Sequence, residues 1–245
     1  NKNSRENRLT PWYCDWVTDV PSEVIYIRFK GENRYFTAAP GIDGGNYIVR
    51  HGCGWSSFMR KGEELETELT VFVPLEEPVK YPLLTISNTS ASPLELELMY
   101  YVKIQEPQGV NKVICTKDDS SLLFNCFRLD AFGALTTFMG CSGGIEEFTC
   151  DNREFYPEMP SLTGKEGVPE EPCGVIKTRA FIDAGKSLQI TFSLGQTFED
   201  GLRDRLLSRA VMPDKILAEL NSVQNYWSGI FDCIQVATPD EAFNI

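Results

Sequence analysis

LELELMYYV, residues 94–102, is the segment that says most about how this chain folds. Its leucines and glutamates alternate with a period of two, so an extended strand carries the leucines on one face and the glutamates on the other. Residues 65–73, LETELTVFV, repeat this alternation earlier in the chain. We expect a half-buried strand at each place, with the glutamates on a solvated face rather than serving as catalytic acids.

Further β-rich runs lie on both sides of this strand, separated by turn residues. We expect strands at residues 24–29, 34–37, 47–52, 55–60, 79–87, 121–128, 133–139, 175–182 and 187–194. The turns at 30–33, 88–93 and 183–186 each predict a local antiparallel hairpin. The stretch 151–174 predicts a long irregular loop that is functional or mobile. The pattern as a whole predicts an all-β fold, a large antiparallel β-sandwich over residues 1–198.

The hydrophobic period changes after Gly195. Residues 198–210 predict one short helix. Pro213 begins a second helix, whose apolar side chains are spaced for one packed stripe: Ile216, Leu220, Val223, Trp227 and Ile230. We assign residues 199–245 to a helical linker. Because residues 239–243 resemble the start of another helix, we expect the chain to be a fragment of a longer protein.

Composition narrows the classes of function. The formal net charge of −12 and the pI near 4.7 disfavour binding to a nucleic-acid backbone. No segment approaches the roughly 20 apolar residues of a spanning helix, and the N-terminus has no apolar signal-peptide core. The eight cysteines form no CxxC pair, which is typical of reduced, mostly buried thiols. We expect a cytoplasmic protein that binds neither membrane nor nucleic acid.

Motifs of familiar catalytic sites are missing from the sequence. His51 is the only histidine, and no histidine, cysteine or carboxylate stands near it at metal-ligand spacing. The sequence has no GxSxG elbow and no glycine-rich phosphate loop. We therefore assign no catalytic residue, no metal ligand and no cofactor. His51 itself fits either a satisfied structural histidine or a site residue.

The segment before the first expected strand, residues 3–12 (NSRENRLTPW), mixes arginines with an indole ring. One interpretation is a plain surface arm. Another is a contact with a sugar or a protein partner, because an indole stacks on the C–H face of a sugar while arginine and asparagine bond its hydroxyls.

Several motifs resemble the N-terminal domain of glycoside hydrolase family 94, formerly glycosyltransferase family 36. They are residues 3–27 (NSRENRLTPWYCDWVTDVPSEVIYI), 49–56 (VRHGCGWS), 68–80 (ELTVFVPLEEPVK), 86–90 (ISNTS) and 236–240 (VATPD). The resemblance runs from end to end, is strongest before Val102 and is weak over 111–174. NRLTPW looks closer to the β-1,2-glucan-related members than to cellobiose phosphorylase itself, whereas Cys14-Asp15-Trp16 departs from an Asn-Asp-Pro-like run.

The family includes cellobiose phosphorylase, other β-glucoside phosphorylases and part of cyclic β-1,2-glucan synthase. The resemblance implies a galactose mutarotase-like supersandwich, then linker helices, then an (α/α)6 barrel that carries the chemistry. Enzymes of the family cleave a β-glucosidic bond with inorganic phosphate as co-substrate, inverting the anomeric centre, and a barrel aspartate is the general acid. These barrel residues have no counterpart in the present chain, so none is assigned.

Two functions are compatible with these observations. The first is a non-catalytic N-terminal domain of a glycoside phosphorylase, inactive alone, which supports homodimerisation and shapes the active-site entrance for a β-glucoside oligosaccharide. The alternative is a free-standing carbohydrate-binding or structural β-sandwich module. A third interpretation, a mutarotase-like enzyme, is disfavoured because such chemistry needs a histidine and carboxylate pair and only one histidine is present.

The expected substrate-binding set consists of cationic and aromatic side chains gathered at one edge of the sandwich, on the route to the barrel: Arg5, Arg8, Trp12, Arg50, His51 and Trp55. Both segments match family motifs, and Gly52 and Gly54 let the backbone approach a neighbour closely. The alternative is a structural role, with the tryptophans in the core and Arg50 paired with an acidic neighbour.

Overall fold

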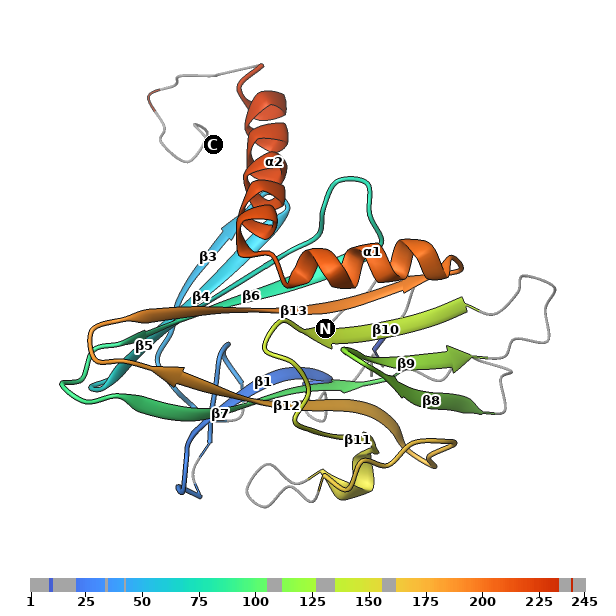
Figure 1. Cartoon of the computed structure of the whole chain (residues 1–245). Coiled ribbons are helices and arrows are strands. Elements are labelled where there is room, and N and C mark those ends of the chain that lie inside the picture. The colour runs from blue at the N-terminus through green and yellow to red at the C-terminus, as the bar shows by residue number, and fades with distance from the viewer. Residues whose placement is uncertain are drawn as a thin grey trace.

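Two antiparallel sheets stack face to face in the computed structural model, which describes residues 9–10, 21–33, 35–41, 43–104, 112–126, 135–155, 162–233 and 239 (Figure 1). The smaller sheet has five strands in the order β11-β12-β7-β1-β2. Its strands are β1 (Glu23–Phe29), β2 (Phe36–Thr37), β7 (Leu94–Lys103), β11 (Glu147–Asp151) and β12 (Pro172–Ile182). The expected all-β sandwich is confirmed.

The larger sheet has eight strands in the order β3-β4-β5-β6-β13-β10-β9-β8. Its first four strands along the chain are β3 (Ile48–Gly52), β4 (Trp55–Lys61), β5 (Leu65–Phe72) and β6 (Val79–Asn88). The others are β8 (Val113–Asp118), β9 (Ser121–Cys126), β10 (Leu135–Cys141) and β13 (Ser187–Thr197). A 3-10 turn η1 (Asn152–Glu154) and the helices α1 (Asp200–Ala210) and α2 (Pro213–Phe231) complete the described elements.

Strand β7 has the alternation that the sequence predicts. The side chains of Leu96 and Leu98 are wholly buried in the core between the sheets. On the opposite face Glu97 binds Arg28 and Lys177 from the two neighbouring strands, with Lys177 Nζ 3.2 Å from Glu97 Oε1. Although partial burial opposes it, hydrogen bonds from these two cations hold the pKa of Glu97 below its ordinary value. The outer glutamates therefore take part in ion pairs across the strands.

Of the three expected hairpins, the one between β1 and β2 is confirmed, and the other two are wrong. Residues 88–93 connect β6 in the larger sheet to β7 in the smaller sheet, and residues 183–186 connect β12 to β13 in the same way. Both connections therefore cross from one sheet to the other. Turn residues reverse the chain equally well in a hairpin and in such a crossing, so local turn chemistry cannot tell them apart.

Asn88 ties the two sheet-crossing connections together. Its side chain is buried, and its Nδ2 donates to Ile182 O at 2.9 Å and to Ser92 O at 2.8 Å. The backbone N–H of Gly185 donates to Asn88 O at 3.1 Å. An amide with donors and an acceptor satisfies both chain segments at once. The polar turn expected at Asn88 is thus an internal fastener at one end of the sandwich.

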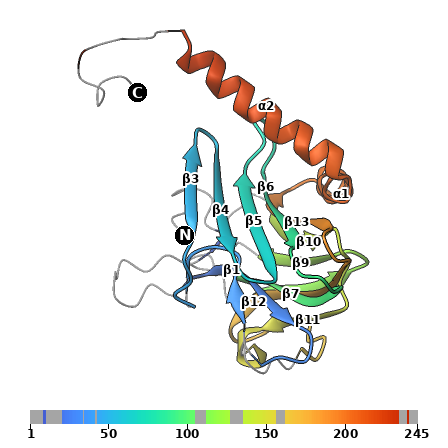
Figure 2. The same ribbon diagram turned by 90° about the vertical axis from the view of Figure 1, so that its left-hand side faces the viewer.

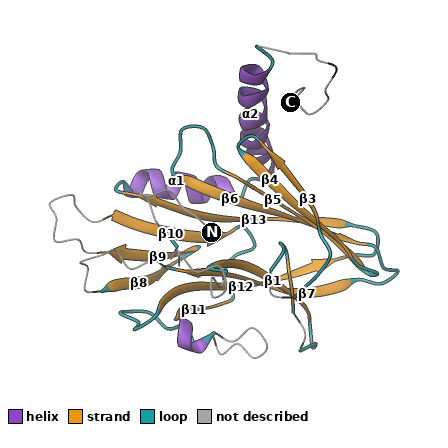
Figure 3. Cartoon of the chain, turned by 180° about the vertical axis from the view of Figure 1, so that it is seen from behind, coloured by secondary structure: helices purple, strands orange, loops and turns teal. Residues whose placement is uncertain are grey.

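Both expected helices are present and cover the outer face of the larger sheet (Figures 1 and 3). Leu206 of α1 and Ile216 and Val223 of α2 pack against the buried rings of Tyr81 and Phe138. Tyr81 Oη donates to Leu206 O at 3.0 Å, and burial raises the pKa of this hydroxyl. An aromatic layer therefore fixes the helices on the sheet.

Helix α2 leans away from the sandwich toward its C-terminal end (Figure 2). Only Ile216 and Val223 of this helix are buried. Tyr226, Ile230 and Phe231 near its end are 50%, 44% and 57% exposed. No described helix is long and apolar enough to cross a membrane.

Candidate functional site

Three of the six expected site residues lie on the β3–β4 hairpin, whose register decides how they point. Arg50 is opposite Ser57, His51 opposite Ser56 and Gly52 opposite Trp55. Residues directly opposite in an antiparallel pair share a face, and neighbours along a strand alternate. Arg50 and Trp55 therefore lie on the face toward α2, and His51 lies on the other face.

Trp55 and the two glycines fasten the hairpin tip to α2. The partly buried Trp55 packs against the apolar cluster beneath the helices. Gly54 has a φ of +81°, and a Cβ built on it would lie 2.6 Å from Val223 Cγ1 and 2.8 Å from Trp227 Nε1. A Cβ on Gly52 would collide with the Trp55 indole. Glycine is thus needed at the tip both for backbone conformation and for close packing.

His51 and Arg50 are the accessible members of the hairpin. His51 Nδ1 lies 2.9 Å from Ser56 Oγ, and its ring meets the ring of Phe58 edge-on with a centroid separation of 6.3 Å. Arg50 is exposed, and among the described residues no carboxylate lies within ion-pair distance of it. The Arg50 guanidinium can therefore contact a ligand or another part of a protein without breaking an ion pair, and His51 can do so through Nε2 while Nδ1 stays bonded to Ser56.

The other expected site residues, Arg5, Arg8 and Trp12, lie outside the described residues, so their clustering with the hairpin stays a prediction. Cys14 and the departure around it lie outside as well. Within the described ranges no group of three metal-binding side chains comes together. Six cysteines whose side chains the structure describes are free thiols: Cys53 at the hairpin tip and Cys233 after α2 are exposed, and Cys115, Cys141, Cys150 and Cys173 are buried.

The exposed end of α2 extends this surface beyond the hairpin. Trp227 packs edge-on against Tyr226 with centroids 5.5 Å apart, and it stacks on Phe231 at 6.1 Å. The stripe Trp227–Ile230 was expected to pack, yet the sandwich reaches only as far as Val223 and, in part, Trp227. The sequence shows an apolar stripe along α2 that is longer than the sheet can cover. The length of the stripe does not show at which residue the contact with the sheet ends.

Two clefts between the sheets were not predicted at all. One, of about 330 Å³, opens beside Glu23, Phe58 and Lys80. The other, of about 340 Å³, is lined by Phe29, Arg60 and their neighbours. Cleft walls combine residues from strands far apart in sequence, so no local pattern announces them.

A polar cluster adjoins the second cleft, which Arg60 and Phe36 line. Arg60 binds Asp43, and its guanidinium carbon lies 4.7 Å from the centroid of the Phe36 ring. Tyr47 Oη donates to Thr37 O at 2.6 Å. Against the effect of partial burial, hydrogen bonds from Arg60 and Thr37 lower the pKa of Asp43. These groups satisfy one another, which indicates a structural role.

The sandwich with helices on the larger sheet agrees with a known domain. The family model "Glycosyl hydrolase 94, supersandwich domain" matches residues 1–209. The chain belongs to this family. The resemblance noted in the sequence motifs is thereby confirmed, and the family 94 supersandwich accounts for the two-sheet core.

Curated relatives of this family 94 chain are much longer proteins. The cyclic beta-(1,2)-glucan synthase NdvB of Rhizobium meliloti is 27% identical over 266 residues, which cover 100% of this chain and 9% of the synthase. The 3-O-beta-D-glucopyranosyl-beta-D-glucuronide phosphorylase of Paenibacillus borealis is 22% identical over 221 residues, which cover 81% of this chain and 28% of the phosphorylase. The chain thus spans less than a third of either relative.

Solved structures agree on the fold. A protein assigned as a kojibiose phosphorylase, from the human microbiome, superposes with a TM-score of 0.54 at 11% identity, covering 86% of this chain and 28% of its own. A bacterial glucoamylase complexed with acarbose superposes with a TM-score of 0.51 at 10% identity, covering 83% and 31%. At such low identity these likenesses establish the sandwich fold only.

Proposed function

We propose that this chain is the non-catalytic N-terminal domain of a glycoside phosphorylase that cleaves β-glucosides with inorganic phosphate. Family membership and the phosphorylase among its relatives support this proposal. The chemistry belongs to a following catalytic barrel, as the resemblance implies, and phosphate is a co-substrate of that barrel. The domain itself supplies no catalytic residue.

The observation that carries the proposal is the exposed aromatic end of α2 beside the β3–β4 hairpin. Tyr226, Ile230 and Phe231 present a contiguous apolar strip at the last described helix. Exposed apolar patches of this kind mark contact surfaces. The catalytic part of the protein is its occupant, since the matched region makes up less than a third of either relative.

The hairpin then lies where the domain meets the barrel. Arg50 and His51, on opposite faces of the hairpin, are the described side chains that flank the active-site entrance, and Arg5, Arg8 and Trp12 join them there. The intact protein is a cytoplasmic homodimer that associates through the sandwich. The competing function, a free-standing carbohydrate-binding module, leaves the end of α2 without an occupant.

Arg50→Ala in the intact protein tests the entrance role. We expect KM for a β-linked glucose disaccharide such as sophorose to rise about 3- to 10-fold, since about 1.4 kcal/mol corresponds to tenfold. The release of glucose 1-phosphate from sophorose and phosphate provides the measurement. The melting temperature stays the same, because Arg50 has no internal ion pair to lose.

Arg179→Ala is the matched control, because Arg179 is a half-exposed arginine of β12 in the other sheet, where it binds Glu146. Its KM stays at the wild-type value. The 245-residue chain alone releases no glucose 1-phosphate. Sustained release by the chain alone, or equal KM values in the two arginine variants, contradicts the proposal.

A further inference from the structure

A cleft of about 330 Å³ between the two sheets has the composition of a small-ligand site. Phe58, Leu69 and Val71 of the larger sheet form one wall, and Ile25 with Pro40 forms the facing one. Most of the lining is apolar, while a few polar groups converge at one end. Ligand pockets in proteins combine an apolar lining with a few placed polar groups in this way, and they span about 300–1,000 Å³.

Three side chains from three strands meet at the polar end of the cleft. Lys80 of β6 donates to Glu23 Oε2 of β1, and Tyr100 Oη of β7 donates to Glu23 Oε1 at 2.8 Å. Tyr100 is wholly buried, and burial, followed by the neighbouring Glu23 charge, raises the pKa of its hydroxyl well above the ordinary value. The hydroxyl therefore remains a donor that holds the carboxylate in place.

This ion pair keeps unused bonding capacity. A carboxylate offers about four lone-pair sites and an ammonium three N–H donors. The described contacts take two sites on Glu23 and one donor on Lys80. Because the two charges balance, the cleft disfavours a charged ligand. It favours a neutral molecule whose hydroxyls both donate and accept and which also has an apolar face.

We propose that this cleft binds a single pyranose ring of a neutral sugar. The hydroxyls bond Glu23 and Lys80, and the C–H face of the ring packs on Phe58. The cleft volume lies at the low end of the range for ligand pockets, which fits one ring rather than an oligosaccharide. The proposal rests on the chemistry of the cleft and is independent of the proposed catalytic parent.

The cleft also adjoins the β3–β4 hairpin. Phe58 lines the cleft and meets the ring of His51 edge-on, and Phe58 is opposite Val49 in the β3–β4 register. His51, the sole histidine, thus stands beside a residue that lines the cleft, and its Nδ1 is hydrogen-bonded to Ser56 Oγ. A sugar that enters the cleft and binds Glu23 and Lys80 would therefore approach the exposed His51 imidazole.

Titration of the 245-residue chain with D-glucose, followed by methyl and aromatic NMR, tests the site. We expect saturable shifts of the Leu69 and Val71 methyls and of Phe58, with a dissociation constant on the order of 1–10 mM. The methyls of Ile216 and Val223, on the helix side, stay unshifted. Cyclohexanol, a ring with one hydroxyl, is the comparison probe and gives no saturable shift at the same concentrations.

The double variant Glu23→Gln/Lys80→Met removes both charges without leaving either one unpaired and weakens glucose binding at least tenfold. Its matched control is Lys30→Met/Glu95→Gln, which removes an exposed ion pair from the outer face of the smaller sheet and leaves binding unchanged. Circular dichroism shows whether each variant is folded. The proposal is overturned if the unmodified chain shows no saturable shift, if cyclohexanol competes equally, or if both double variants bind alike. Loss of phosphorolysis in the intact protein leaves this result untouched, so the two proposals fail separately.

Discussion

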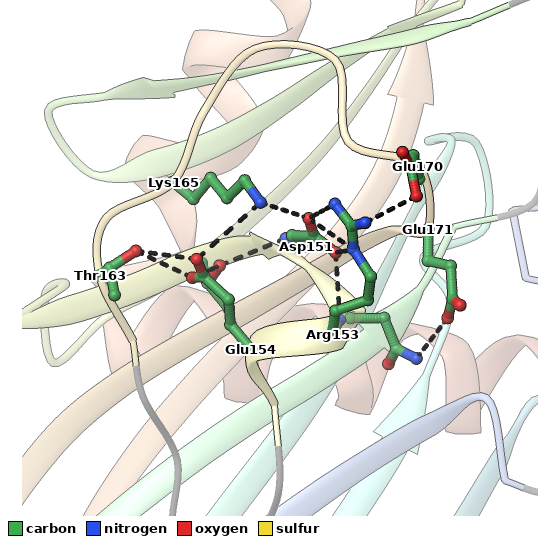
Figure 4. Close-up of polar contacts among 9 residues, drawn as sticks. Asp151, Arg153, Glu154, Thr163, Lys165, Glu170 and Glu171 are labelled. Carbon is green, nitrogen blue, oxygen red and sulfur yellow. Dashed lines mark hydrogen bonds and ion pairs between the residues drawn. The ribbon is translucent and has the colours of Figure 1, made fainter.

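On the outer face of the smaller sheet a loop is fastened by buried charge, whereas on the outer face of the larger sheet two helices are fastened by aromatic packing. Residues 152–155 and 162–171 lie over a cluster that includes Tyr26, Tyr101 and Phe155, with the last two rings stacked 4.9 Å apart. Asp151, wholly buried, accepts from Arg153 Nη2 at 2.7 Å and from Lys165 Nζ at 2.5 Å (Figure 4).

The two closures end differently. The loop on the smaller sheet closes on itself, since Thr163 Oγ1 donates to Glu154 Oε2 at 2.9 Å and Arg153 Nη1 donates to Glu170 Oε2 at 2.6 Å (Figure 4). The helical layer on the larger sheet instead extends past the hairpin and leaves Phe231 exposed. The described loop on the smaller sheet is thus held by contacts within the chain, while the helical layer leaves an exposed apolar surface. The expected long loop is therefore ordered structure over residues 152–155 and 162–171.

Breaking the charged closure should have the largest effect on stability. Asp151→Asn leaves Arg153 and Lys165 without a buried carboxylate, and we expect a loss of about 3 kcal/mol in the free energy of unfolding. Urea denaturation of the chain at pH 7 measures the loss. The control Glu170→Gln changes the same charge at an exposed partner of Arg153 and costs less than about 0.5 kcal/mol. Equal losses in the two variants contradict the comparison.

The stability that Asp151 contributes should depend on pH in a definite direction. Hydrogen bonds from Arg153, then from Lys165, hold the pKa of Asp151 well below its ordinary value, which is about 3.9 in unfolded chains. Above pH 5 the carboxyl is charged in both states, and its full contribution to stability is present. Below about pH 4 the unfolded chain takes up the proton first, so this contribution falls with pH. The stability gap between wild type and Asp151→Asn must therefore narrow as pH falls from 5 to 3.

Loosening the helical closure should have a smaller effect. Gly54→Ala puts a Cβ against Val223 and Trp227 and imposes a left-handed conformation on a residue with a side chain, at a cost of about 1–2 kcal/mol. Gly31→Ala is the control, because Gly31 has a similar φ of +85° with nothing within 4 Å of its Cβ position. Only Gly54→Ala should also change the tryptophan fluorescence. Identical spectra for both variants would show that the hairpin tip does not position α2.

Periodicity predicted which residues form strands and helices, because burial on one face imposes a local pattern. The alternation in β7 and the switch at α1 were both visible in this way. Pairing depends on distant partners, so the connections at 88–93 and 183–186 were mistaken for hairpins. Asp151 gave no signal, since its partner Lys165 comes from the far side of a loop.

In the candidate site, too, local features were predicted and contacts between distant residues were not. Gly52 and Gly54 were predicted to permit a close approach, and the close neighbours are Trp55 and α2. One interpretation paired Arg50 with an acidic neighbour, yet no carboxylate among the described residues lies within ion-pair distance of it. The cleft beside Glu23 needs β1, β6 and β7 in one place. Only the assembled sandwich shows that arrangement.

The smallest effect on the chain itself is expected where the helical layer is unfinished. Ile230→Ser/Phe231→Ser removes exposed apolar groups that make no core contact, so the unfolding free energy of the 245-residue chain should change by less than about 0.5 kcal/mol. In the intact protein the same groups are expected to be buried against the catalytic part. There the double variant should lower the melting temperature by several degrees and raise the rate of proteolysis after α2.

Light scattering should return the wild-type dimer mass, since the dimer contact is proposed for the sandwich. Val211→Ser is the control, because Val211 is a 50% exposed residue between the two helices. It should change neither the unfolding free energy of the 245-residue chain nor the melting temperature of the intact protein. An intact double variant as stable as wild type would mean that the end of α2 is not where the rest of the protein docks.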